Sequence, residues 1–227
     1  MGMITAQRIA AALLGGSMSG AQLETLLGTS SGMAGWKLCA ATESIKSIML
    51  TDPTAKAAWM GSNKAVDAMA TLSVDIAEMF AADSTIIASV FSNASRADTW
   101  FAGSITRAAV WGSDTALTAL AASATGKARA RACAKYTLQS VVGASTEQTF
   151  PEPLGKDGER WILVGWGASA NINITISGRR DGSSVGLLSS YVNMSATAAI
   201  DNVMALKGPV RGNISGGYTG YFGAVRV

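Results

Sequence analysis

The sequence predicts an α+β protein with more than one domain, in which an N-terminal stack of short α-helical repeats precedes a C-terminal antiparallel β-sandwich. Two patterns carry this prediction. Bulky apolar residues recur about every ten positions in the first part of the chain, and a period of two replaces this spacing beyond Lys135. A hydrophobic content of 48% over 227 residues gives the chain enough apolar surface for a core.

Four parts are expected along the chain. They are an N-terminal helical segment (1–43), the repeat stack (44–126), a linker with a first strand (127–147) and the β-sandwich (148–227). In the first part, leucines recur at helical spacing, and we expect Gly15-Gly16 and Gly28 to end helices. The apolar run Ile9 to Leu14 is shorter than that of a secretion signal, so an amphipathic first helix is preferred.

The repeat stack shows as a ladder of bulky apolar residues spaced by nine to eleven positions. Its rungs are Met49-Leu50, Trp59-Met60, Met69, Met79-Phe80, Val90-Phe91, Trp100-Phe101, Val110-Trp111 and Leu120. Capping residues follow the rungs, because Ser, Thr, Asp and Asn accept hydrogen bonds from the free N–H groups of a new helix. We expect Ser104 and Ser113 to begin helices. Gly61, Gly103 and Gly112 are expected to close the preceding helices in left-handed turns.

One long helix with an eleven-residue repeat, forming a right-handed coiled coil, is the alternative. The irregular spacing, the helix-breaking Pro53 and the absence of coiled-coil charge pairs argue against it. Short helices are unstable alone, so each must bury its apolar pair against its neighbours. We therefore favour a compact stack of short helices with a structural role.

The last third of the chain reads as β-structure. "RWILVGW" from Arg160 predicts a buried strand, and "NINITIS" alternates, with Ile172, Ile174 and Ile176 on one face. "GRRDGSS" (178–184) predicts a hairpin turn. Further strands are expected in "SVGLLSSYV", "IDNVMALKGPV" and "YTGYFGAVRV".

Composition removes several classes of function. Histidine is absent and Cys39 and Cys133 are the only cysteines, which excludes Ser-His-Asp and Cys-His catalysis and His-containing metal sites. We therefore expect no catalytic, cofactor-binding or metal-binding residues and no cofactor. The carboxylates Glu147, Glu152, Asp157, Glu159, Asp181 and Asp201 leave a glycan-processing enzyme open as an alternative.

Charge and hydropathy describe the expected partners. A formal net charge of +3 is small for this length, so no nucleic-acid partner is expected, and the basic residues between Lys127 and Lys135 favour helix-end electrostatics or a subunit contact. No run approaches the ~18 apolar residues of a membrane span. Charged residues make up only 15% of the chain, which favours a surface largely covered by other subunits.

Six residues are candidates for contact with a ligand or another subunit. They are Trp161, Trp166, Arg179, Arg180, Tyr218 and Tyr221. Trp161 and Trp166 lie in one strand at an odd separation, so we expect opposite faces and one exposed indole, able to stack on a sugar or a subunit. The two arginines lie in the expected hairpin turn, and the two tyrosines lie near the C-terminus.

Three segments, "SDTALTALAASATG", "SITRAAVWG" and "DSTIIASVF", resemble the short Ser/Ala-rich helical repeats of bacteriophage virion proteins, especially tail-fibre and related appendage proteins. The closing segments "PLGKDGERWILVGWG", "GRRDGSSVG" and "YFGAVRV" are similar to the small all-β tips that follow such repeats. The resemblance spans residues 44–227 and carries over no individual binding residue.

The resemblance implies a non-enzymatic structural protein of a phage particle, assembled in the bacterial host cytoplasm. Residues 1–43 would attach to other virion proteins, and the β domain would project toward a host-surface glycan or another subunit. A homo-oligomer, with a trimer as first choice, is expected. A capsid decoration or head-fibre protein is the alternative within the same class.

Overall fold

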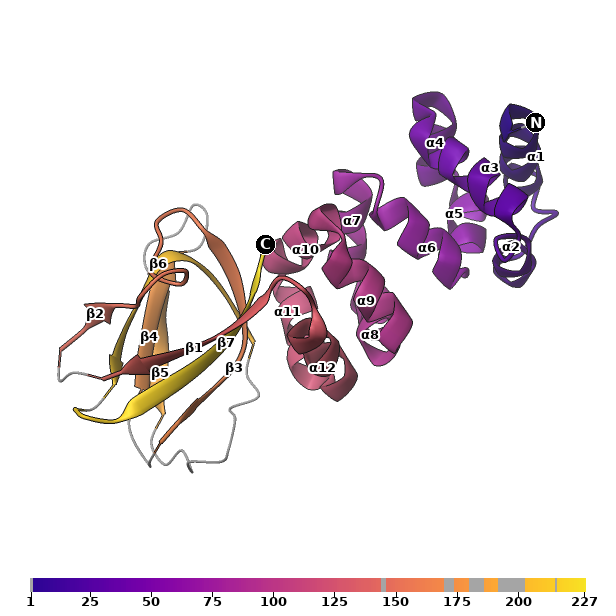
Figure 1. Ribbon diagram of the computed structural model, residues 1–227. Helices are drawn as coiled ribbons and strands as arrows, with labels where there is room; N and C mark the ends of the chain where they lie inside the picture. The colour runs from indigo at the N-terminus through magenta and orange to yellow at the C-terminus, as the bar shows by residue number, and fades with distance from the viewer. Residues whose placement is uncertain (1, 144–145, 170–173, 180–185, 192–202, 215) are drawn as a thin grey trace. The chain divides into compact units, whose positions relative to one another are not determined.

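The computed structural model describes residues 2–143, 146–169, 174–179, 186–191, 203–214 and 216–227 (Figure 1). Within these residues the chain forms helices followed by strands, which confirms the α+β class. Contacts divide the chain into two compact units, Met1–Phe80 and Ala81–Val227.

The described helices and strands occupy the following ranges. The helices are α1 (Gly2–Leu14), α2 (Gly20–Leu26), α3 (Ser30–Ala41), α4 (Glu43–Thr51), α5 (Pro53–Met60), α6 (Asn63–Ala70), α7 (Val74–Ala82), α8 (Ser84–Ser92), α9 (Ala94–Ala102), α10 (Ser104–Gly112), α11 (Asp114–Ala122) and α12 (Ala124–Ala132). The strands are β1 (Tyr136–Val142), β2 (Gln148–Thr149), β3 (Arg160–Ala168), β4 (Ile174–Arg179), β5 (Gly186–Tyr191), β6 (Met204–Ile214) and β7 (Thr219–Arg226). The last helix therefore runs past the boundary that we placed at residue 126.

Buried tryptophans hold the first unit together. Trp36 and Trp59 lie with ring centroids 6.1 Å apart, and Trp59 meets Phe80 edge-on at 5.4 Å. Both indole N–H groups have acceptors, because Trp36 donates to the Ala65 carbonyl and Trp59 to the Met49 carbonyl. Within this unit, helices three apart in sequence pack together, namely α1 with α4, α2 with α5 and α3 with α6.

From α7 to α12, helices of nine residues follow one another with a single linking residue, so the repeat is ten residues long. This confirms a stack of short helices, and the alternative of one continuous helix is wrong. In α11 the buried positions are Ala116, Leu117 and Leu120, which lie three, four and seven residues after the linking residue Ser113. The same positions are buried in α8. Each helix thus buries one narrow face against its neighbours.

The linking residues end one helix and begin the next because their backbone is extended. Asn93 has φ −114° and ψ 122°, and its side chain accepts a hydrogen bond from the Arg96 N–H. Asp83, Ser113 and Ser123 cap α8, α11 and α12 in the same way. Such caps satisfy N–H groups that a new helix leaves unpaired. The sequence-based expectation that Ser113 begins a helix is confirmed.

The expectation that Gly61, Gly103 and Gly112 close helices in left-handed turns is wrong. Gly103 itself is the linking residue before α10, with φ −74° and ψ 135°, so Ser104 is the first helical residue and not the cap. Gly61 has φ −74°, and Gly112 is the last residue of α10. None of the three adopts a left-handed conformation. The chain leaves α5 through Gly61 in a right-handed helical conformation and leaves α9 and α10 through the extended residues Gly103 and Ser113. Any amino acid can adopt these conformations, so glycine is not required there.

Helices three apart also pack together in the second unit, α8 against α11 and α9 against α12. The linking residues connect these layers. Ser113 Oγ donates to the Ala81 carbonyl at 2.7 Å, and Ser123 Oγ donates to the Phe91 carbonyl at 2.6 Å. Three helices therefore make one turn of the stack, and each of these two serine hydroxyls bonds to the end of a helix beside the junction about one turn earlier.

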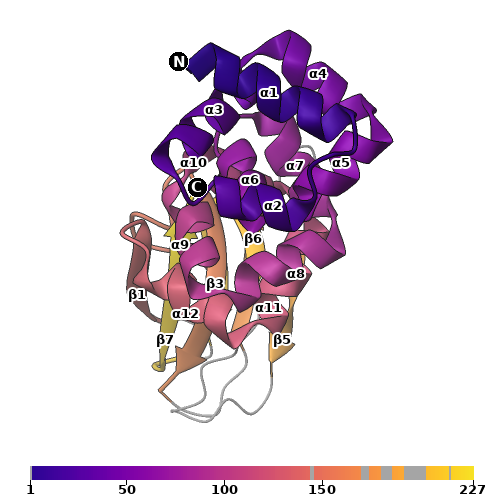
Figure 2. The ribbon, with the colours of Figure 1, turned by 90° about the vertical axis from the view of Figure 1, so that its right-hand side faces the viewer.

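All seven described strands belong to one antiparallel sheet with the order β1-β7-β3-β6-β4-β5, and β2 pairs with β6. Figure 1 shows that this sheet is strongly curled. One core fills its inner face, built from Val141, Phe150, Leu154, Trp161, Leu163, Trp166, Ala168, Ile176, Met204, Leu206, Val210, Ile214, Phe222 and Ala224. The sandwich is not confirmed, because the described strands form one connected sheet instead of two packed layers. α12 packs against β1, β3 and β7 (Figure 2).

Candidate functional site

Neither candidate tryptophan is exposed. Trp161 is 2% exposed and Trp166 3%, and both belong to the core of the sheet. The expectation of opposite faces is wrong, because the pairing of β3 with β7 shifts register between Leu163 and Gly165. An extra residue at such a bulge returns both indoles to the inner face. Stacking of either ring on a sugar or a partner is thereby excluded in this conformation.

Of the two candidate arginines, Arg179 is the last residue of β4. Arg179 pairs in register with Lys207 of β6. Arg180 and most of the expected hairpin turn lie outside the described residues. The antiparallel pairing of β4 with β5 agrees with the expected hairpin.

Tyr221 is 43% exposed and lies on the outer face of β7, directly opposite Ser140 of β1. Leu138 and Val142 lie two residues to either side of Ser140 and are each 67% exposed. Residues two apart on a strand share a face, so Leu138, Val142 and Tyr221 form one apolar surface, the β1–β7 patch. Tyr218, 44% exposed, lies at the end of the same strand pair, where its carbonyl accepts from the Gly143 N–H.

β1 is also an edge strand. In the described part of the chain it pairs only with β7. The Lys135 carbonyl and the Gly143 N–H bond to β7. By the alternation of an antiparallel pair, the backbone groups of Leu138 and Ser140 point to the free edge. Residues 136–142 contain no charge and no proline, which are the usual protections of a strand edge.

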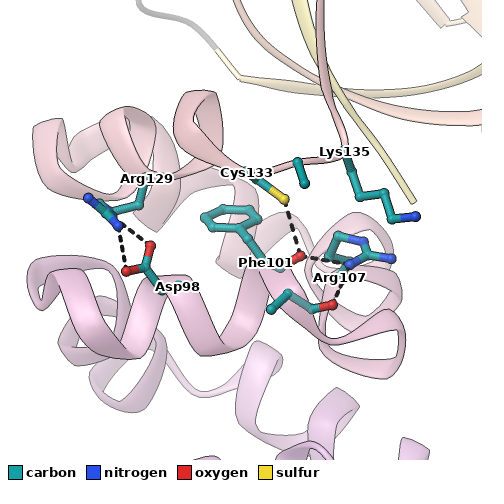
Figure 3. A pocket seen from close by; sticks show the side chains of 8 residues that line it. Asp98, Phe101, Arg107, Arg129, Cys133 and Lys135 are labelled. Atoms are coloured by element: carbon teal, nitrogen blue, oxygen red, sulfur yellow. Dashed lines mark hydrogen bonds and ion pairs between the residues drawn. The ribbon is translucent and has the colours of Figure 1, made fainter.

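A pocket of about 250 Å³ lies where the helical stack ends and β1 begins (Figure 3). This end-of-stack pocket is lined by Asp98, Phe101, Ala102, Arg107, Arg129, Cys133, Ala134 and Lys135. Cys133 occupies the position of the next linking residue, and its Sγ lies 3.4 Å from the Phe101 carbonyl, as the Ser123 hydroxyl lies against Phe91 one repeat earlier. The chain then turns into β1, and within the described ranges no helix follows α12 at this end of the stack.

An ion pair closes one side of the end-of-stack pocket. The Arg129 guanidinium holds the Asp98 carboxylate with two hydrogen bonds, Nε to Oδ1 at 2.6 Å and Nη2 to Oδ2 at 2.5 Å. The hydrogen bond to Asp98 raises the pKa of Arg129. Both carboxylate oxygens of Asp98 are therefore engaged by Arg129.

Arg107 is 6% exposed, and its Nη1 donates to the Phe101 carbonyl at 2.7 Å and to the Ala102 carbonyl at 2.8 Å. It thus caps the C-terminal end of α9, where a cation is favoured by the helix dipole. Lys127 does the same for α11, because its Nζ donates to the Ala121 carbonyl at 2.9 Å. Arg107 Nε is buried without an acceptor in the described structure.

The basic residues between Lys127 and Lys135 make different contacts. Arg129 pairs with Asp98, and Arg131 donates to the Val164 carbonyl of β3 at 3.0 Å. Lys135 is exposed and lines the pocket. Most of these basic side chains are therefore engaged in contacts at helix ends or between elements. Sequence reasoning missed Arg107, because only the folding of the stack brings it near Arg129, Cys133 and Lys135, which lie more than twenty positions later.

No group of three or more His, Cys, Asp or Glu residues that could hold a metal ion occurs within the described ranges. Glu159, a candidate carboxylate for glycan hydrolysis, is bound by Arg226 at 2.7 Å. Cys39 donates to the Ala6 carbonyl, and burial raises the pKa of its thiol to about 11, so it is not a thiolate near neutral pH. Asp181 and Asp201 lie outside the described residues.

Comparisons with known protein-family models and with curated proteins found no match to this chain. Among the described helices none has the length and apolar character that crossing a membrane requires.

Proposed function

We propose that this chain is a non-enzymatic structural protein of a bacteriophage particle, a component of a tail fibre or tail appendage. The observation that carries the proposal is the regular ten-residue repeat from α7 to α12, joined turn to turn by the hydroxyls of its linking residues. A regular stack of this kind places its two ends at a fixed separation, which suits a spacer. In this proposal the helices from residue 1 to 43 attach the chain to other virion proteins.

The polar residues of the stack support a structural role. The buried cations Arg107 and Lys127 bond to helix-terminal carbonyls. Ser113 and Ser123 cap helices and bridge turns. These side chains are committed to holding the repeat together, and such groups have little capacity left for proton transfer or nucleophilic attack.

The β1–β7 patch supports the proposal that copies of this chain assemble with one another. Leu138, Val142 and Tyr221 present apolar surface beside a free strand edge that carries no charge. A symmetric assembly brings identical surfaces together, and an uncharged edge avoids like-charge repulsion there. We propose a homotrimer that buries this patch, with the rest of the β domain directed to a host-surface glycan or another tail protein.

A capsid decoration or head-fibre protein is the second candidate, because a protein on the phage head could use the same helical spacer and the same β1–β7 patch. The test is quantitative mass spectrometry of purified particles, followed by separation of heads from tails. We expect the chain in the tail fraction in a fixed copy number. Recovery with the heads would favour the second candidate, and absence from particles would contradict both.

The enzymatic alternative has its own test. Purified chain incubated with host polysaccharide is expected to release no reducing ends. Hydrolysis that is lost in Glu159→Gln would contradict the structural role and support a glycan-processing enzyme.

A further inference from the structure

The end-of-stack pocket carries more positive than negative charge. Arg107, Arg129 and Lys135 line it together with a single carboxylate, that of Asp98, which leaves a net charge of +2. Asp98 is the one acidic side chain that lines the pocket, and because Arg129 already holds both of its oxygens, the lining offers no carboxylate to Arg107 or Lys135. Figure 3 shows the Arg129–Asp98 pair on one side of Phe101 and Arg107 and Lys135 on the other. The unpaired charge is therefore concentrated on one side of the pocket.

Nearby carbonyls offset only part of this charge. The Phe101 and Ala102 carbonyls at the end of α9 accept from Arg107 Nη1, and a helix end carries roughly half a negative charge. The Lys135 side chain is exposed and forms no hydrogen bond or ion pair in the described structure. The Lys135 charge and part of the Arg107 charge are therefore not offset by the groups that line the pocket.

Arg107 has donors beyond those that its structural task uses. At the equivalent position two repeats later, a single ammonium, that of Lys127, is sufficient to cap α11. A guanidinium has five N–H donors in a fixed fork, and Arg107 uses those of Nη1 for α9. The two hydrogen bonds to the carbonyls also fix the orientation of the guanidinium, so its remaining N–H donors are held in place at little entropic cost.

We propose that the end-of-stack pocket binds a small oxyanion, a phosphate or a short carboxylate, through Lys135 and the Arg107 guanidinium. The volume of about 250 Å³ admits an anion of this size with a few waters, but it is below the range of typical cofactor pockets. Phe101, Ala102 and Ala134 form apolar walls that lower the local dielectric and strengthen the attraction. The site does not depend on the proposed virion role.

The test uses the full-length chain with inorganic phosphate as probe and sodium chloride at equal ionic strength as reference. Chemical shifts of the backbone amides of Ala134 and Lys135 are followed by NMR, together with the thermal unfolding midpoint. We expect saturable shift changes and a rise in the midpoint with phosphate concentration. Acetate, followed in the same way, reports whether a carboxylate is accepted as well as phosphate.

Lys135→Gln removes the charge and is expected to weaken phosphate binding about tenfold or more, because hydrogen bonds to charged groups are among the stronger ones. Lys37→Gln is the matched control, since Lys37 is an exposed lysine of α3 and its loss changes the net charge equally. It should bind phosphate as the wild type does. Arg107→Lys keeps a cation that can cap α9 but removes the fork, and should also weaken binding.

Two results would overturn the proposal. One is the absence of saturable shifts at Ala134 and Lys135 in the wild type. The other is equal phosphate affinity in Lys135→Gln and Lys37→Gln, which would mean that the pocket cations are not the ligands. If Arg107→Lys fails to fold, the comparison of Lys135→Gln with Lys37→Gln still shows whether the pocket binds phosphate.

Discussion

At the residue scale, the serines that link the helices each perform two tasks. Ser123 Oγ accepts from the Gly126 N–H at 2.9 Å and donates to the Phe91 carbonyl at 2.6 Å. The first bond caps α12, and the second satisfies a carbonyl near the end of α8, one turn earlier. A single hydroxyl thus joins local helix formation to the packing of the stack.

We predict that Ser123→Ala lowers the free energy of unfolding by about 1–3 kcal/mol, because it removes a helix cap and leaves the Phe91 carbonyl without its donor. Urea denaturation followed by circular dichroism measures the change. Ser92→Ala is the control, because the Ser92 hydroxyl only bonds back to the Ser89 carbonyl on an exposed helix end. Equal stability of the two variants would contradict the bridging role.

Most of the helix caps were predictable from single residues, because Asp, Ser and Asn act on N–H groups within the next three positions. Asp52, Ser62, Asp83 and Asn93 all cap as their side chains indicate. The two indoles on β3 could not be placed this way, since a bulge depends on the pairing with β7 and not on the alternation of the strand itself. The pocket could not be predicted either, because its lining comes from three helices and the turn that precedes β1.

At the element scale, polar contacts lock helix pairs together at their ends. Glu24 of α2 accepts from the Ser62 hydroxyl at 2.6 Å and from the Lys64 N–H at 2.9 Å, at the start of α6. Burial alone would raise the pKa of Glu24, but these hydrogen bonds and the Lys64 charge hold it below its ordinary value. The ionised carboxylate therefore contributes to the stability of this helix pair.

Because the pKa of Glu24 is lower in the folded state, its contribution is present above the ordinary value of 4.5 and is lost as the pH falls through the folded value. We predict that Glu24→Gln destabilises the chain at pH 7 and that its difference from wild type shrinks below about pH 4.5. Urea midpoints measured from pH 7 to pH 3 test this. A difference independent of pH would show that the charge plays no part.

The ten-residue unit makes a second prediction at this scale. Deleting residues 103–112 joins Ala102 to Ser113, so that a capping residue again follows a nine-residue helix. We expect a less stable but folded chain with one helix fewer, because the following helices change their partners but keep the same buried positions. Circular dichroism and the cooperativity of urea unfolding report this. Complete unfolding would contradict a modular stack.

At the scale of the whole molecule, the low charge content of the sequence agrees with the β1–β7 patch. Only 15% of the residues are charged, and strand β1 has none. Leu138 and Val142 are both 67% exposed, and side chains of this kind are usually covered when they gather beside a free edge. Self-assembly through this surface would cover both the apolar side chains and the edge.

We predict that Leu138→Lys dissociates the assembly and leaves the fold of the monomer intact, because the residue is exposed within one chain. Light scattering after size exclusion measures the mass of wild type and variant. Leu72→Lys, which changes another exposed leucine outside the patch, should keep the wild-type mass. A monomeric wild type would contradict the assembly, and a wild-type dimer would contradict the trimer.

The central claim is that this chain is a structural part of a phage particle, and electron cryomicroscopy of the intact particle tests it most directly. We predict density for the ten-residue helical stack in symmetry-related copies on the tail, with the β1–β7 patch buried between copies. A particle in which every density is accounted for by other chains would contradict the account.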